Sequence, residues 1–134
     1  MRRPLSASIV GLAVFAGALS GRHPAEEAYT PLAPGAVVTK LNQFRHAQGI
    51  PGTVRHNPAL STGCRLHNAW MRRNRSYSHG ERRGSPGYTT AGAKAGQSSA
   101  LAAGPTWRTG NPWLNAPFHL VAMLNPGMVE SGAS

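Results

Sequence analysis

The residues of this chain that could support chemistry are two histidines, His79 and His119, which lie forty residues apart. His119 follows Pro117 in the first turn of a predicted helix, where the helix dipole favours a neutral imidazole, the form that binds metal ions. Two helices packed antiparallel would bring the histidines together, and Glu81 or water would complete a site for a divalent ion, zinc or calcium. Isolated histidines more often form hydrogen bonds within a fold or lie exposed on its surface. A metal-binding role and this structural or surface role therefore both stay open.

Other catalytic classes lack their residues. The chain contains no Asp, so it cannot build a Ser-His-Asp triad, and no Gly-x-Ser-x-Gly motif is present. Glu81 and Glu130 are the only carboxylates after residue 34, which disfavours the paired-carboxylate chemistry of glycosidases. The sequence has no phosphate-binding loop and no dinucleotide fingerprint. The histidines are therefore the remaining candidates for catalysis or metal binding.

The charge of the chain is strongly positive. Its 134 residues include 14 Lys and Arg against 4 acidic residues, a formal net charge of +10. Such a surface favours an anionic partner, either a cell-envelope polymer, lipid headgroups or nucleic acid, although a solvated basic face is the simpler interpretation. Nucleic acid is the least favoured partner, because no aromatic residues alternate with the arginines for base stacking. The candidate anion contacts are Arg65, Arg72, Arg73, Arg75, Arg82 and Arg83.

The remaining notable side chains are predicted to be structural. Cys64 is the single cysteine, so no internal disulfide can form, and its place on an apolar helix face predicts a buried, inert thiol. His67 lies on the same face and is predicted to be a core or cleft-edge residue. Trp70 and Trp113 are predicted to be packing anchors.

The element that must position these residues is a helix predicted over residues 57–74. Asn57 is a favourable N-cap and Pro58 a favourable first helical residue. Apolar residues then recur at helical spacing and form one broad stripe. A short exit segment, residues 76–78, leads to His79.

Flanking elements are less distinct. We predict a helix over 34–48, which begins at Pro34 and is ended by Gly49, and a short extended piece over 53–55. After the helix over 57–74, we predict a loop over 80–92 and a short helix or irregular segment over 93–103. The last predicted element is a helix over 117–124.

The N-terminus has the pattern of an export signal. Arg2 and Arg3 precede an uncharged apolar run over residues 5–19, and small residues allow cleavage after Ser20. We therefore expect a signal peptide over 1–20, a proline-containing linker over 21–34 and one domain over 35–134. The mature protein would be secreted or associated with the cell envelope, and would be a monomer. An uncleaved anchor is the alternative, although the run is short for a membrane span.

The order of several short motifs resembles the CAP superfamily (cysteine-rich secretory, antigen-five and pathogenesis-related proteins), and most closely its bacterial SCP-like branch. The resemblance covers roughly residues 36–132. The motifs are Asn-Pro-Ala-Leu at 57–60, Ser-Tyr-Ser-His at 76–79, Ser-Pro-Gly-Tyr at 85–88, Trp-Leu-Asn-Ala-Pro-Phe-His-Leu at 113–120 and Leu-Asn-Pro at 124–126.

The resemblance implies an α+β fold, an α-β-α sandwich, with a cleft in which two histidines and two acids bind a divalent ion in some members. His79 and His119 match the two histidine positions. Gln97 stands where the family has its first acid, and no residue matches the second. Glutamine is a poor zinc ligand and cannot act as a base, so the resemblance favours a cleft without catalysis.

Family members also continue into further strands, whereas this sequence stops at Ser134. We therefore expect a C-terminally truncated, mostly helical domain whose sheet is largely missing. The function that these observations favour is a non-catalytic binding or envelope-associated module. The alternatives are a divalent-metal-assisted hydrolase using the two histidines, and a basic polyanion-binding protein without the CAP fold.

Overall fold

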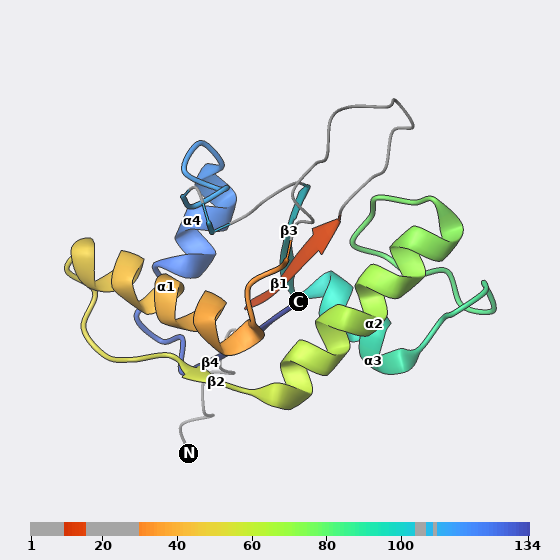
Figure 1. Cartoon of the computed structure of the whole chain (residues 1–134), viewed down its shortest axis with the longest axis horizontal. Helices are drawn as coiled ribbons and strands as arrows, with labels where there is room; N and C mark the ends of the chain where they lie inside the picture. The colour runs from red at the N-terminus through yellow and green to blue at the C-terminus, as the bar shows by residue number, and fades with distance from the viewer. Residues whose placement is uncertain (1–9, 16–29, 104–106, 109) are drawn as a thin grey trace, which may run out of the picture.

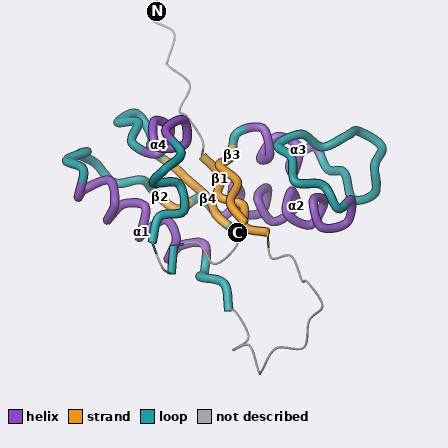
Figure 2. Tube along the Cα trace, turned by 90° about the horizontal axis from the view of Figure 1, so that it is seen from above, coloured by secondary structure: helices purple, strands orange, loops and turns teal. Residues whose placement is uncertain are grey.

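The structure, a computed structural model, describes residues 10–15, 30–103, 107–108 and 110–134. Its elements have mixed α and β character. The helices are α1 (Pro34–Ala47), α2 (Pro58–Asn74), α3 (Thr90–Gln97) and α4 (Pro117–Met123), and the strands are β1 (Val10–Phe15), β2 (Arg55–His56), β3 (Ser99–Ala103) and β4 (Glu130–Ala133). Figures 1 and 2 show the strands between two pairs of helices, with α1 and α4 on one side and α2 and α3 on the other.

The strands form one sheet in the order β2-β4-β1-β3, and every pairing is parallel. Helices on both faces are what a parallel sheet requires, because both of its faces must be covered. The expectation that the sheet is largely missing is therefore wrong for the described residues. The expectation of a mostly helical domain is not met either, because the helices, with 14, 17, 8 and 7 residues, hold fewer than half of the described residues, and the strands have 6, 2, 5 and 4.

The central strand comes from the apolar run that the sequence assigns to an export signal. Gly11 of β1 pairs with Ser99 of β3 on one edge and with Gly132 of β4 on the other. Residues 1–9 and 16–29, which include the expected cleavage point and most of the expected linker, lie outside the described residues. None of the helices in the described part of the chain is both long and apolar enough to cross a membrane.

The helix predictions are confirmed where the sequence carries clear end signals. Asn57 caps α2, and its side-chain oxygen accepts hydrogen bonds from the Ala59 and Leu60 backbone amides at 2.9 and 3.4 Å. Prolines at the start of α1 and α4 also stand where predicted. The prediction over 93–103 is wrong in detail, because a helix capped by Thr89 ends at Gln97 and the strand β3 follows.

The main core lies between the sheet and the α1–α4 pair. Trp113 is 2% exposed there, and Trp70 is 4% exposed in a smaller cluster with Met71 and Leu101, so both predicted packing anchors are confirmed. Cys64 is buried as predicted. The buried residues of the main core are Val37, Val38, Leu41, Val54, Ala100, Trp107, Trp113, Met123, Met128 and Ala133.

Candidate functional site

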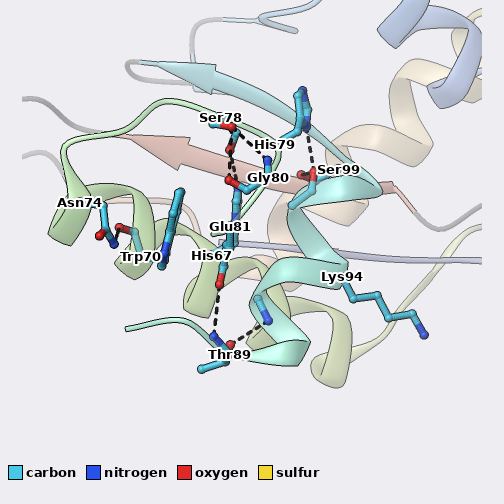
Figure 3. A network of polar contacts seen from close by, with 12 residues as sticks. His67, Trp70, Asn74, Ser78, His79, Gly80, Glu81, Thr89, Lys94 and Ser99 are labelled. Carbon is cyan, nitrogen blue, oxygen red and sulfur yellow. Dashed lines mark hydrogen bonds and ion pairs between the residues drawn. The ribbon is translucent and has the colours of Figure 1, made fainter. Parts of the chain in front are cut away.

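A buried polar network joins α2, the loop that follows it and the start of α3 (Figure 3). His67 Nδ1 lies 2.9 Å from Glu81 Oε1, and neither side chain is exposed to solvent. His67 Nε2 lies 2.8 Å from the Ser78 carbonyl oxygen, which can only accept, so this nitrogen carries a proton. Both ring nitrogens of His67 are therefore bonded within the fold.

The second oxygen of Glu81 is also bonded within the fold. Glu81 Oε2 accepts a hydrogen bond from the Thr89 backbone amide at 3.2 Å, and Thr89 Oγ1 in turn accepts from the Gly92 amide at 2.9 Å. A carboxylate at a helix N-terminus is favoured by the helix dipole. Glu81 thus fastens the start of α3 to His67 on α2, and both its oxygens are occupied.

Two glycines allow α3 to approach α2 this closely. A Cβ atom at Gly92 would lie 2.5 Å from Glu81 Oε1, and one at Gly96 would overlap His67 Cε1 and the His79 carbonyl. A side chain at either position would therefore displace the network. The small residues of α3 are a requirement of the packing.

The loop after α2 is fixed to the same helix by hydrogen bonds. Trp70 Nε1 donates to Ser85 Oγ at 2.6 Å, and Ser85 Oγ donates to the Arg82 carbonyl at 2.5 Å. Asn74 Nδ2 donates to the Pro86 carbonyl at 2.9 Å. The Trp70 ring also stacks on His67, with ring planes 9° apart. These contacts hold residues 82–86 in a defined position beside the end of α2.

Arginines project from this fixed end of the molecule. Arg72 and Arg73 form the last turn of α2, and Arg75 follows in a left-handed conformation with φ of 48°. We call Arg72, Arg73, Arg75, Arg82 and Arg83 the arginine tip. All five are exposed, as is Arg65 two turns earlier on α2. The ion pairs among the described residues are Arg55–Glu130 and His67–Glu81, so no arginine of the tip is neutralised by a described carboxylate.

The two histidines proposed from sequence lie in different surroundings. His79 is exposed beside α3, and its Nδ1 donates to the Gly96 carbonyl at 2.8 Å. His119 is half-buried on α4, with its ring centroid 6.1 Å from that of Trp113. Gln97 is exposed at the end of α3. Within the described residues, no group of three or more His, Cys, Asp or Glu could hold a metal ion.

Glu81 has a different partner from the one that the sequence suggested. The sequence suggests that Glu81 completes a metal site with His79 and His119, whereas its carboxylate bonds to His67. Sequence reasoning recognised His67 as a core residue but missed this pair. The available signal was that a buried histidine needs hydrogen-bond partners, and that few carboxylates exist to supply one.

A small apolar cavity of about 150 Å³ is lined by residues of α2, α3 and β1. It is below the roughly 300 Å³ at which pockets for drug-sized ligands begin. Its lining consists of Gly11, Ala59, Leu60, Gly63, Cys64, Ala91, Lys94, Ala95 and Ser98. The cavity therefore offers room for solvent or a very small molecule only.

Comparisons of the chain with protein-family models, with curated proteins and with solved structures find no match.

Proposed function

We propose that this chain is an exported, CAP-like binding module that uses the arginine tip to contact a phosphate-bearing anionic surface of the cell envelope, and that it is not an enzyme. The observation that carries the proposal is the gathering of five exposed arginines, none paired with a described carboxylate, at one end of α2. Guanidinium groups bind phosphate through paired hydrogen bonds, which makes arginine the suitable side chain for such a surface.

The position of the tip supports a binding role. Trp70–Ser85 and Asn74–Pro86 hydrogen bonds hold the loop with Arg82 and Arg83 against α2. Groups that are fixed before binding lose less conformational entropy when the partner arrives. The tip is therefore better prepared for an extended anionic surface than arginines on a free tail would be.

The buried network supports a structural and not a catalytic role for His67 and Glu81, the one histidine–carboxylate pair among the described residues. His67 and Glu81 have no exposed side-chain surface, and the nitrogens and oxygens of both are bonded within the fold. A general base must come within hydrogen-bond reach of its substrate. A pair that is enclosed on all sides stabilises the fold around the arginine tip and leaves no atom for a substrate.

Other features support the CAP-like and exported parts of the proposal. The sheet lies between two helical layers, as the resemblance implies, and His79 follows the central helix by a short exit segment. The basic start and apolar run of residues 2–19 support export.

Vesicle sedimentation tests the proposed function. The full chain should sediment with vesicles of phosphatidylcholine mixed with phosphatidylglycerol, and stay in solution with phosphatidylcholine alone. High salt should release it, because binding between exposed charges is screened. Soluble polyphosphate that competes with the vesicles would indicate a polymer partner, whereas polyphosphate without effect would indicate lipid headgroups. Equal sedimentation with both vesicle types at all salt concentrations would refute the proposal.

A metal-assisted hydrolase remains the second candidate, favoured by one observation. The His79 Nδ1 proton points to the Gly96 carbonyl, which leaves Nε2 of this exposed ring as the nitrogen able to bind a metal ion. That candidate predicts that zinc or calcium raises the thermal midpoint of the chain and that His79→Ala abolishes the rise. The binding proposal predicts no such rise.

A further inference from the structure

We infer that the gap between β3 and β4 is a strand-accepting site, filled in the uncut chain by its own segment Val10–Phe15, which closes over the Cys64 thiol.

The sheet depends on this one segment for its continuity. β1 is the only strand hydrogen-bonded to β3 in the described sheet, and it also pairs with β4. Without β1, the β2–β4 pair and the single strand β3 would present unpaired edges toward each other. Unpaired strand edges are templates for another extended chain.

The site between β3 and β4 restricts the size of the side chain at one position of the strand that fills it, residue 11. A Cβ atom on residue 11 would lie 2.5 Å from Cys64 Sγ and 3.3 Å from Ser99 Cβ. Glycine is therefore the residue that fits against Cys64. The thiol is 1% exposed with Gly11 in place, so strand and thiol cover each other.

The chemistry of the occupant follows from the strand itself. Its sequence is Val-Gly-Leu-Ala-Val-Phe, which is uncharged and rich in residues that favour strands. The partner class is thus an extended, apolar segment that enters parallel to β3 and β4 and has glycine at its second position. Cleavage after Ser20 would cut this segment from the domain, so one molecule cannot use residues 10–15 both as a discarded signal and as a covalently linked strand.

The single cysteine provides the test, because its reactivity reports whether the strand is seated. The full-length chain is treated with a maleimide attached to polyethylene glycol, a reagent too large for the cavity that Cys64 lines. We expect labelling at least about 100-fold slower than in urea, since the reaction requires local opening. Gly11→Val should accelerate labelling to near the unfolded rate. Gly80→Val makes the same change at an exposed glycine, where the nearest atom to the new Cβ would be Ser78 Oγ at 3.9 Å, and should leave the thiol protected.

A synthetic peptide tests acceptance of a separate strand. A peptide with the Val10–Phe15 sequence flanked by lysines should restore protection to the Gly11→Val chain, and the peptide carrying the same substitution should not. If circular dichroism shows the Gly11→Val chain to be unfolded, Gly11→Ala is used in its place. Rapid labelling of the unmodified chain, or unchanged protection in the Gly11 variant, would overturn the inference. Failure of the first peptide to restore protection would overturn it too.

Discussion

The side chains of His67 on α2 and Glu81 in the following loop form a fully enclosed pair, with Nδ1 and Oε1 2.9 Å apart. The loop therefore cannot leave the helix without exposing both groups or stranding one of them. Through Thr89, the same carboxylate also fixes the first residue before α3. One buried pair thus connects the three segments that support the arginine tip.

Removal of one partner from this pair should destabilise the fold strongly. Glu81→Ala or His67→Ala is expected to lower the free energy of unfolding by about 3 kcal/mol or more, because the remaining buried group loses its partner. The double variant should cost much less than the sum of the two. Urea unfolding followed by tryptophan fluorescence measures all three.

The exposed ion pair of the chain is the matched control. Arg55 and Glu130 are 2.8 Å apart with side chains 74% and 35% exposed, so Arg55→Ala, which removes the more exposed partner, should cost only about 0–1 kcal/mol. A cost for Glu81→Ala as small as this would contradict the structural role of the buried pair.

Close packing of α3 on α2 should make one glycine irreplaceable. Gly96→Ala adds a methyl group where His67 and the His79 carbonyl already lie, and we expect a loss of about 1–3 kcal/mol from overpacking. Gly35→Ala is the control, since its nearest neighbour would be 3.6 Å away and alanine favours a helix. Thermal melts should therefore shift down for the first variant and up or not at all for the second. Equal shifts would show that α3 is not packed as described.

The elements that the sequence predicted well are those with local signals. Asn57-Pro58 begins α2 and Pro34 begins α1, because capping and proline geometry act within a few residues. The burial of Cys64 and His67 also followed from the helical spacing of apolar residues.

What the sequence left undetermined depends on contacts between distant residues. A run of small residues over 93–103 carries no period that separates a helix from a strand, and pairing with β1 decides the outcome for Ser99–Ala103. The segment around Gly11 has the composition of an export signal and equally that of a buried parallel strand. The Glu81–His67 contact spans 14 residues and a loop, so spacing alone could not select it over His79.

A buried guanidinium joins α1 to the end of α4. Arg45 is 1% exposed, and its Nη1 donates to the carbonyls of Met123 and Asn125 at 2.5 and 3.0 Å. Burial lowers the pKa of Arg45 from its ordinary value, yet arginine stays charged in proteins, so the cation complements the negative end of α4. Arg45→Met should cost about 2–3 kcal/mol in urea unfolding, the value of hydrogen bonds to a charged group. An unchanged free energy of unfolding would contradict this expectation. It would show that Arg45 contributes only through packing of its side-chain stem, which methionine keeps, and not through its guanidinium group.

Charge removal at the arginine tip should weaken vesicle binding without loss of stability. Arg73→Gln with Arg83→Gln removes two exposed positive charges that lack described acidic partners. We expect affinity for phosphatidylglycerol vesicles to fall by about thirtyfold, since each of the two basic groups near an anionic surface contributes roughly 1 kcal/mol. Arg55→Gln with Lys40→Gln removes the same charge elsewhere and should change affinity less. An equal loss in both double variants would mean that net charge, and not the tip, determines binding.

The contact between Gly11 and Cys64 should appear as an energetic coupling. Gly11→Ala places a methyl group 2.5 Å from Cys64 Sγ and should destabilise the full chain, whereas Cys64→Ala should remove only part of a buried side chain. The loss of unfolding free energy in the double variant should then be smaller than the sum of the two single losses by about 1–2 kcal/mol. The reason is that Cys64→Ala removes the Sγ atom that the new methyl group at residue 11 overlaps. Urea unfolding of the four chains measures this coupling, and the Gly35→Ala and Cys64→Ala pair supplies the additive reference, because His56 and not Cys64 is the neighbour of a Cβ atom at Gly35. Additive losses in the Gly11 cycle as well would show that strand β1 does not lie on α2 at this point, and the sheet would then lack its central strand in solution.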